Sequence, residues 1–597
     1  MKIMGAYIVE RIPCDSTRVR ITSEADPSVK PIFDANEPIH VQSSGHDIIR
    51  GDSAMNLTPL QGLSSPALAE RYRQGDARLR DLFGSHPSIA EDWRKRVEHL
   101  DRTEAGRIDK SRLRSVLRDF QAKLLPNEAV DRSIEALAQP GSLAVVGGQQ
   151  AGLFGGALLI AYKAISVIQT ARYAESMLGR KVVPVFWIAG EDHDFDEANH
   201  LYVSAVDSKP RRVRLERPEG QRHSVSRTSL TGEQWNAAVE QLSAALPDSE
   251  FKPALLDRIR SFSADAPTLT VSFARLLSEW FGPEGLVLLD ADDPQLRRLE
   301  GPMFRRLIED NEALEHALRN GEEAVIELGY SLQAPSSTNG ANLFVHSEEG
   351  RLLLFREEGG FADKKKTVSY TREELLNLSE EEPELLSNNA LTRPLMQEYA
   401  LPVLATVLGP SEIAYWAELK PAFERFSLQL PLLIPRQSFT YLEPGVDKLL
   451  AKYGVTVEDI ITRGERLKEE WLQDQDRWNL EERFDEIRAG VMGLYAPLLE
   501  TLSEVEPALG ELGTTNQGRV LEQIAYLEKR AADTVAKQHD VSLKQWDRMR
   551  DSLWPLDKPQ ERALSTLHFL NRFGPNWLKG WLEVPFDVTG GHRLASE

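Results

Sequence analysis

The chain has 597 residues, a formal net charge of −21 and a single cysteine, Cys14. A chain of this length accommodates about four structural units. The acidic balance argues against a nucleic-acid partner, because binding a polyanion normally requires a clustered basic surface. One thiol forms neither an internal disulfide nor a cysteine-rich zinc site. Such a low cysteine content is typical of proteins in a reducing cytosol. We therefore expect a cytoplasmic protein that binds no nucleic acid.

Two further features concern targeting and the start of the chain. No apolar stretch approaches the ~20 residues of a membrane-spanning helix, and the N-terminus lacks a signal-peptide pattern. We therefore expect no membrane association. Residues 1–54 mix short apolar stretches with turn formers and show no sustained period, so they cannot bury enough surface to offset their backbone entropy. We expect this segment to be poorly ordered and dispensable, with Met55 as an alternative start to Met1.

A strand, a glycine-rich turn, a helix and a second strand follow one another between residues 141 and 205. Residues 143–146 and 182–188 are short apolar runs typical of buried strands. The turn GGQQAGLFGG at 147–156 separates the first run from a long apolar helix. This βαβ order predicts a parallel, Rossmann-like α/β sheet.

The remaining regions are assigned by their periodicity and by breaks in composition. Residues 342–355 predict a β-hairpin with an acidic turn, and 285–290, 403–408 and 430–435 predict further core strands. The predicted organisation is a poorly ordered extension at 1–54, a helical segment at 55–140, the first half of a nucleotide-binding core at 141–205, a helical insertion at 206–280, the second half of the core with the hairpin at 281–445, a coiled-coil arm at 446–553 and a C-terminal helical segment at 554–597.

The arm is expected to be an antiparallel helical hairpin. Apolar residues recur every three to four positions over 487–505 and again over 520–535, and Pro507 and Gly510 interrupt the pattern between them. Two such stripes without an evident partner in the same chain predict a homodimer through this arm. The alternative is a helical flap folded over the core.

The glycine-rich turn is the first candidate site. A strand that feeds such a turn into a helix N-terminus offers backbone N–H groups to a phosphate or carboxylate. The turn matches neither the P-loop nor the dinucleotide fingerprint. Tight strand–helix packing is the alternative reason for its small residues, although paired glutamines favour ligand contact. The candidate nucleotide- or substrate-binding residues here are Gly148, Gln149, Gln150, Gly152, Gly155 and Gly156.

An acidic cluster follows the second strand, where ligands bind in open α/β sheets. We expect Glu191, Asp192 and His193 to face the cleft as catalytic residues, with His193 as a general base or a hydrogen-bond donor. Asp192 and Asp194 are the candidate Mg²⁺ ligands, and acids here could also grip a substrate ammonium. One acid, Asp194 or Asp196, is expected to cap the next helix.

Two later segments contribute further candidates. Arg393 could clamp a carboxylate or phosphate as a catalytic residue, or could be a surface arginine beside a helix start. In GPSEIAYW at 409–416, Ser411 is expected to cap a helix, and the aromatic residues could stack on a base or fill the core. The remaining candidate nucleotide- or substrate-binding residues are Asn389, Gly409, Glu412, Tyr415, Trp416 and Arg436.

Four stretches together resemble the BshC family of cysteine ligases: VVGGQQAGLFGG at 145–156, PVFWIAGEDHDFDEANH at 184–200, NNALTRPLMQEY at 388–399 and GPSEIAYWAELKPAF at 409–423, with LNRFGP at 570–575. The resemblance runs from Met55 to nearly the end of the chain. It implies the last step of bacillithiol synthesis, in which cysteine is joined to the amine of glucosaminyl malate with ATP and Mg²⁺. It also implies a core like that of class I aminoacyl-tRNA synthetases, with insertions and a coiled-coil arm.

The chain departs from those synthetases at both of their ATP signatures. Gln150-Ala151-Gly152-Leu153 stands where they carry His-Ile-Gly-His, and no Lys-Met-Ser-Lys-Ser loop occurs. Activation through an adenylate or through an acyl phosphate therefore both stay open. Two other classes are also open: a nucleotide-dependent transferase of the nucleotidyltransferase type, and a non-catalytic coiled-coil scaffold with a degenerate nucleotide fold.

Overall fold

The computed structural model describes residues 53–63, 65–205, 207–220 and 222–596, and the backbones of three short N-terminal strands. The chain divides into two units, Met1–Val41 and Gln42–Glu597. In the first unit, β1 (Ile8–Arg11) pairs antiparallel with β2 (Val19–Thr22). The predicted disorder and dispensability of residues 1–54 fall almost wholly outside the described residues and stay predictions.

The larger unit is built on a five-stranded parallel sheet. Its spatial order is β16-β15-β5-β6-β9, so the first three strands in the chain run outward in one direction and the last two in the other. This is the Rossmann-like order 3-2-1-4-5, and it confirms the predicted fold class. The strands are β5 (Leu143–Gln149), β6 (Val182–Ile188), β9 (Val287–Asp290), β15 (Val403–Leu408) and β16 (Leu432–Pro435).

Helices cover both faces of this sheet, as near-continuous apolar strands require. In β6, Phe186 and Ile188 pack into a core that contains α6 (Leu158–Leu178) and α10 (Leu269–Phe281). The alternate residues Val185 and Trp187 pack into a second core. That second core is completed by α4 (Lys110–Gln121), α5 (Glu128–Leu137) and the start of α11 (Pro294–Glu309).

A second sheet of five antiparallel strands has the order β13-β12-β11-β10-β14. Its central pair is the predicted hairpin, with Val345 opposite Leu352. The sequence did not predict the other three strands. The bounds are β10 (Gly340–Ser347), β11 (Gly350–Glu357), β12 (Gly360–Asp363), β13 (Ser369–Thr371) and β14 (Leu386–Asn388).

A third sheet joins distant parts of the chain in the order β17-β18-β4-β3. The C-terminal strand β18 (Gly591–Ser596) lies between β17 (Gln437–Leu442), to which it is parallel, and β4 (Ser53–Pro59), to which it is antiparallel. The edge strand β3 (Ile48–Arg50) pairs with β4. A small antiparallel pair is formed by β7 (His200–Ser204) and β8 (Pro210–Arg214).

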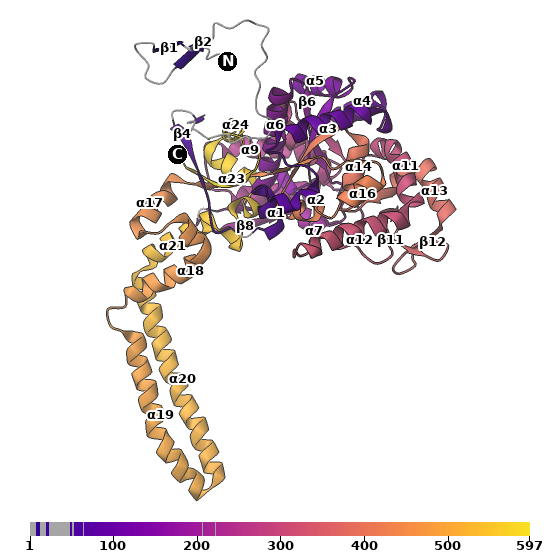
Figure 1. Cartoon of the computed structure of the whole chain (residues 1–597). Helices are drawn as coiled ribbons and strands as arrows, with labels where there is room; N and C mark the ends of the chain where they lie inside the picture. The colour runs from indigo at the N-terminus through magenta and orange to yellow at the C-terminus, as the bar shows by residue number, and fades with distance from the viewer. Residues whose placement is uncertain are drawn as a thin grey trace, which may run out of the picture. The chain divides into compact units, whose positions relative to one another are not determined.

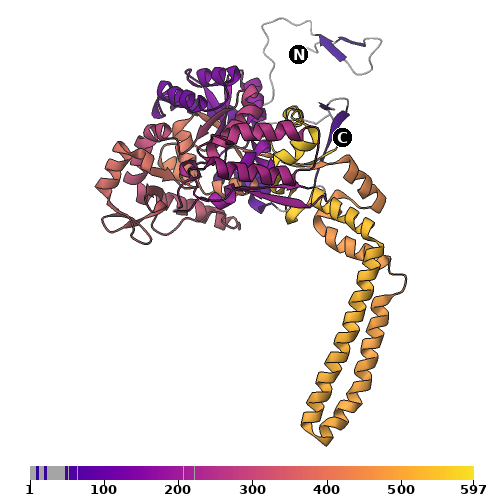
Figure 2. The same ribbon diagram turned by 180° about the vertical axis from the view of Figure 1, so that it is seen from behind.

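Two long helices, α19 (Leu480–Val505) and α20 (Pro507–Gln538), lie side by side in both views (Figures 1 and 2). The chain turns between them at Glu506, so the predicted antiparallel hairpin is confirmed, with the break at Pro507. The predicted arm also includes three flanking helices that form their own small core. These are α17 (Pro444–Tyr453), α18 (Val457–Asp474) and α21 (Asp540–Leu553).

The other helices are mostly short and cover the sheets or connect them. Within the described residues, no helix is long and apolar enough to span a membrane. These covering and connecting helices are α1 (Ala67–Arg73), α2 (Arg80–Phe83), α3 (Ala90–Arg102), α7 (Phe195–Ala198), α8 (Gly232–Ala245), α9 (Lys252–Ser263), α12 (Asn311–Glu327), α13 (Arg372–Glu381), α14 (Arg393–Ala400), α15 (Pro410–Trp416), α16 (Lys420–Arg425), α22 (Gln560–Ala563), α23 (Thr566–Phe573) and α24 (Trp577–Leu582).

Candidate functional site

The strand order places a topological switch point between β5 and β15. The chain leaves β5 toward β6 on one side, whereas β15 leads to β16 on the other. In open α/β sheets, ligands bind outside the carboxyl ends of the strands at such a point. Three of the segments predicted from sequence follow β5, β6 and β15, so the parallel sheet gathers them at this edge, whereas Asn389 and Arg393 lie between β14 and β15.

Lys163 bridges the switch point and was not among the predicted residues. Its ammonium group donates to the Gly148 carbonyl (2.7 Å) and the Gln149 side-chain oxygen (3.0 Å), at the end of β5. It also donates to the Glu412 carboxylate (2.6 Å), in the first turn after β15. A single buried cation therefore ties together the two strand ends that flank the predicted ligand crevice.

Burial and charge act against each other in this bridge. Burial lowers the pKa of Lys163, and the Glu412 charge only partly offsets this effect. Burial alone would raise the pKa of Glu412, but the charges of Lys163 and Arg393 and the donated hydrogen bonds hold it below its ordinary value. Glu412 also accepts from the Gly409 backbone N–H (2.7 Å). We therefore describe the pair as an ammonium–carboxylate ion pair.

The glycine-rich turn folds into a short 3-10 helix, Leu153–Gly155, before α6 begins at Leu158. Gly155 and Gly156 adopt positive φ angles of 89° and 66°. A Cβ at Gly152 would lie 2.8 Å from the Gly156 Cα. These glycines are buried, so backbone conformation and close packing account for them, which is the alternative that the sequence left open.

The N-terminus of α6 is partly closed by the C-terminal part of the chain. The Leu158 N–H, in the first turn of the helix, donates to the Leu564 carbonyl (2.8 Å). Ala157 forms an isolated antiparallel bridge with Ser565. Because this backbone already uses part of the helix terminus, the partly exposed end of β5, Gly148 to Gln150, is the better placed part of the turn for ligand contact.

Gln150 links the turn to the acidic cluster after β6. Its amide donates to the Asp192 carboxylate, which also accepts from the Asp194 backbone N–H (3.1 Å). Burial would raise the pKa of Asp192, but these hydrogen bonds and the Arg351 charge hold it below its usual range. Asp194 caps α7 by accepting from the Glu197 N–H (3.1 Å), which confirms the predicted cap.

These acids do not form a preformed metal centre. Across the part of the chain that the structure describes, no group of three or more His, Cys, Asp or Glu side chains is placed to hold a metal ion. Mg²⁺ with a bound nucleotide needs only one or two carboxylates besides phosphates. Magnesium contact by Asp192 or Asp194 therefore stays a prediction.

Glu191 belongs to a buried ion-pair cluster. Its carboxylate pairs with Arg297 of α11, which also pairs with Glu300 (2.7 Å). Burial is the largest influence on Glu300 and raises its pKa to about 7. Arg297 is fully buried, so its removal would leave Glu191 without its charge partner. The cluster fastens the end of β6 to α11 and gives Glu191 a structural role.

His193 is held by an arginine from the second sheet. Arg351 of β11 donates to the His193 Nδ1 (3.2 Å) and to the Asn388 carbonyl (2.6 Å). Burial and the Arg351 charge lower the pKa of His193, so the ring is neutral at pH 7. Like Arg297, Arg351 was not predicted because its partner lies far away in the sequence.

Two of the later candidates, Arg393 and Tyr415, are hydrogen-bonded to each other. Arg393 donates to the Tyr415 hydroxyl (2.9 Å), and Glu412 and Tyr415 both help to keep its guanidinium charged. Asn389 donates to the Asn342 side chain (2.8 Å) and accepts from two backbone N–H groups before α14.

Two others have internal roles, and one predicted helix cap is wrong. Trp416 is buried beside Phe423 and fills the core rather than an open face. Arg436 forms a buried, bidentate ion pair with Glu561 (2.5 and 2.8 Å). The predicted cap by Ser411 is wrong: Gly409 is the N-cap residue of α15, and its N–H bonds to the Glu412 side chain instead.

Polar residues of this edge that keep partial exposure are the ones best placed to meet a ligand. They come from the ends of β5, β6 and β15 and from the segment around the start of α14. They are Gly148, Gln149, Gln150, Asp192, His193, Asn389, Arg393 and Glu412.

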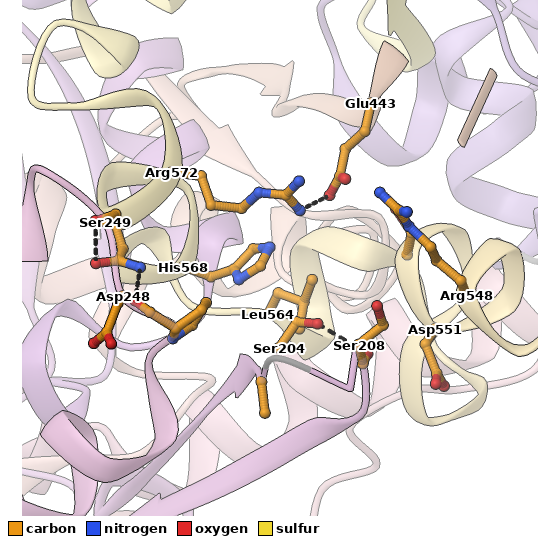
Figure 3. Close-up of a pocket in the computed structure, with 14 residues that line it drawn as sticks. Ser204, Ser208, Asp248, Ser249, Glu443, Arg548, Asp551, Leu564, His568 and Arg572 are labelled. Atoms are coloured by element: carbon orange, nitrogen blue, oxygen red, sulfur yellow. Dashed lines mark hydrogen bonds and ion pairs between the residues drawn. The ribbon is translucent and has the colours of Figure 1, made fainter. Parts of the chain in front are cut away.

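A separate cavity of about 440 Å³ is lined by residues from β7, α21 and α23 (Figure 3). Within it, Arg572 pairs with Glu443 (2.6 Å), and His568 is buried with its pKa lowered to about 3 by burial. It shares no residue with the predicted strand-end site. Opposite charges are both present in its lining, so the cavity does not define one class of ligand.

Comparisons with known families cover almost all of the chain from Met55 onward. Residues 55–437 match the family model described as bacillithiol biosynthesis BshC, N-terminal Rossmann-like domain. Residues 439–596 match the model described as bacillithiol biosynthesis BshC, C-terminal coiled-coil domain. These matches agree with the parallel sheet and with the helical hairpin.

Curated relatives carry the name "Putative cysteine ligase BshC". One from Bacillus cytotoxicus is 34% identical over 479 residues, covering 80% of this chain and 89% of its own length. One from Bacillus licheniformis is 32% identical over 541 residues, covering 90% and 99%. A solved structure from Campylobacter jejuni titled "putative arginyl t-RNA synthetase" covers 74% of this chain and 100% of its own, at 9% identity and a TM-score of 0.20. That score is too low to support an argument, so the fold rests on the strand order and the family models.

Proposed function

This chain belongs to the BshC family of bacillithiol biosynthesis, and we propose that it is an ATP-dependent ligase that joins cysteine to the amine of glucosaminyl malate. We propose further that it works in the cytoplasm as a homodimer and needs no nucleic acid. The family membership supports a ligase that acts on cysteine. The ATP dependence and the second substrate rest on chemistry and on the strand-end site.

The chemistry requires an activated carboxyl group. An amine and a free carboxylate do not condense unaided in water. In this proposal, ATP transfers either its adenylyl group, with release of pyrophosphate, or its terminal phosphoryl group, with release of ADP, to a carboxylate oxygen of cysteine. The amine nitrogen then attacks the carbonyl carbon, the C–O bond to AMP or phosphate breaks, and the amine loses a proton.

The observation that carries the proposal is the bridge from Lys163 to the ends of β5 and β15. It holds partly exposed polar groups on both sides of a switch point, where nucleotides bind in this fold. A fully buried lysine is costly to desolvate, and a scaffold with a degenerate fold has no need of it. This observation favours an enzyme over a scaffold.

The partly exposed side chains suggest a division of roles. The Arg393 guanidinium suits a carboxylate or a phosphate, because its planar fork matches both. Asp192 keeps its negative charge at neutral pH and suits the ammonium group of cysteine. Magnesium, in this proposal, enters with the phosphates of ATP. His193 lies beside Asp192 at the same edge.

The direct test uses the purified full-length chain with ATP, Mg²⁺, cysteine and glucosaminyl malate. Mass spectrometry should find bacillithiol, and omission of either cysteine or the glucosaminyl compound should abolish it. The nucleotide product then decides the route, since AMP indicates an adenylate and ADP an acyl phosphate.

The same assay separates the two alternatives. Pyrophosphate release without an amide product would favour the nucleotidyltransferase class. No turnover of ATP and no amide under any of these conditions would favour a non-catalytic scaffold and would end the ligase proposal.

A further inference from the structure

The contact between Arg351 and His193 fixes more than the position of the imidazole ring. The Arg351 Nη1 lies 3.2 Å from the His193 Nδ1. Arginine has only donors and stays protonated in proteins, so Nδ1 has to be the acceptor. A neutral imidazole carries one proton, and that proton is then on Nε2.

We propose that Arg351 is a positioning residue that holds His193 as its Nε2–H tautomer, so that His193 meets the substrate as a neutral hydrogen-bond donor. In that tautomer, Nε2 has no free lone pair with which to accept a proton. The general-base role that the sequence left open is thereby set aside in favour of the donor role. The natural acceptor is an anionic oxygen, of a carboxylate or a phosphate.

Arg351 is itself held in one orientation by three contacts from its own sheet. Its Nε donates to the Ser387 hydroxyl (2.9 Å) and its Nη2 to the Asn388 carbonyl (2.6 Å). Its guanidinium lies over the Phe344 ring, 3.7 Å from the centroid. The remaining contact is the one to His193. Since Arg351 is 8% exposed, the guanidinium has little freedom to turn away from the imidazole.

A carboxylate at hydrogen-bond distance from Nδ1 would favour a proton on that nitrogen, but the acids around His193 do not provide one. The nearest Asp192 oxygen lies 3.8 Å from Nδ1, and both Asp192 oxygens already accept, from Gln150 and from the Asp194 N–H. Asp194 is occupied by its cap. Among the described residues no partner is recorded for Nε2, and the side chain is 35% exposed, so that nitrogen is available to a ligand.

This inference rests on the proposed function only for the identity of the acceptor. If cysteine is activated at this edge, the acceptor is a carboxylate or phosphate oxygen on which negative charge develops. A neutral donor stabilises such an oxygen through a preorganised hydrogen bond, without itself taking up a proton. The tautomer is a property of the protein alone and does not depend on that identity.

The first test is nitrogen NMR of the full-length protein labelled with ¹⁵N-histidine, recorded at pH 7.5 without substrate. The chain has 12 histidines, so the resonance of His193 is assigned by its loss in His193→Gln. We expect a protonated Nε2 and an unprotonated Nδ1. A protonated Nδ1 would overturn the proposal, whatever the enzyme turns out to catalyse.

The second test asks whether Arg351 sets this state. In Arg351→Met, the Nδ1 resonance should move toward a mixture of the two tautomers, because the obligatory donor is gone. An unchanged Nε2–H tautomer in this variant would show that Arg351 does not set the tautomer of His193. This spectroscopic signature is independent of activity, so failure of the ligase proposal and failure of the tautomer proposal remain distinguishable.

The third test compares two amides in the ligase assay. A glutamine places an N–H near the position of Nε2, whereas an asparagine places it near Nδ1. His193→Gln should therefore keep a kcat/KM at least about tenfold above that of His193→Asn, the size of one hydrogen bond to a charged group. Equal loss in both variants, with an intact melting curve, would contradict the donor role.

Discussion

Lys163 connects the ends of β5 and β15 at the switch point. Lys163→Met leaves the Glu412 carboxylate without its charge partner and releases the end of β5. We expect kcat/KM to fall by about 100-fold or more, because small displacements of positioning groups have effects of that size. Stability should also fall, by on the order of 1–3 kcal/mol, since a largely buried charge loses its hydrogen-bond partner.

A double variant separates these two effects. Lys163→Met combined with Glu412→Gln removes both charges, so the melting temperature should recover while activity does not. Lys181→Met is the matched control, because Lys181 is more than half exposed and pairs with Glu175 at the surface. Surface pairs contribute little, so that control should resemble the parent. Full activity in the double variant would show that the bridge is structural only.

Asp290, at the end of β9, predicts a specific pH dependence of stability. Burial, followed by the charge of Asp292, raises its folded-state pKa to about 7 from 3.8. Between these values the folded state binds a proton that the unfolded state does not. The stabilisation that protonated Asp290 contributes to the free energy of unfolding is therefore complete below about pH 4. It is lost as the pH rises through about 7.

Asp290→Asn should abolish this loss. Asparagine resembles the protonated acid and can still accept from the Asp292 N–H (3.0 Å). The melting temperature of the variant, relative to the parent, should rise between pH 5 and pH 8, by the equivalent of a few kcal/mol at most. A pH-independent difference between the two proteins would place the pKa of Asp290 near its ordinary value.

At the residue scale, sequence alone could predict contacts within one turn but not those between distant segments. The Asp194 cap follows from local spacing, and the acids after β6 follow from their place at a strand end. Arg297 and Arg351 lie 106 and 158 residues from the partners they hold. Lys163 did leave a signal: it is a lone charge in the apolar run LLIAYKAISVIQ of α6, and such a charge is costly unless it is paired.

At the element scale, β18 is the strand that closes the third sheet. It lies between β17 and β4, with Ala595 fully buried and Arg593 over the Phe439 ring (4.7 Å). Deletion of residues 591–596 removes the backbone partners of both neighbours. We expect a clearly lower melting temperature in a thermal shift assay, together with loss of soluble protein.

The matched comparison is deletion of residues 1–54. A chain that starts at Met55 keeps the pairing of Asn56–Pro59 with β18 and loses from this sheet only the edge strand β3 and the first two residues of β4. Stability and ligase activity should therefore persist, as the sequence predicts. Loss of activity on this deletion would contradict dispensability, and an unchanged melting curve without β18 would contradict the role given to that strand.

The elements themselves were predictable where a local pattern specifies them. Strands β5, β6, β9, β15 and β16 are continuous apolar runs, and the long helices repeat every three to four residues. Strands β12, β13 and β14 are short and partly polar, so no local pattern marks them. The third sheet depends on pairing between residues hundreds of positions apart, which periodicity does not report.

At the scale of the whole molecule, the hairpin of α19 and α20 carries apolar side chains that the other described residues leave exposed. Leu494 is 76% exposed, Val505 70% and Leu527 60%. Exposed apolar surface of this extent along a helix pair is typical of an interaction surface. Because the hairpin is antiparallel and its stripes are sustained, a second copy of the same hairpin is the partner we propose.

Light scattering combined with size exclusion tests this assembly. We expect a dimer for the full chain and a monomer for the combined variant Leu494→Glu and Leu527→Glu, because four carboxylates would then be buried at the interface. Both side chains are solvent-exposed, so neither change should unfold a single chain.

Ile326→Glu is the matched control: Ile326 of α12 is also exposed, at 55%, but lies outside the arm, so that variant should remain dimeric. A dimer that persists in the arm variant, and also after residues 487–528 are replaced by a short glycine–serine linker, would place the interface elsewhere. A monomeric full chain at micromolar concentration would exclude the homodimer altogether.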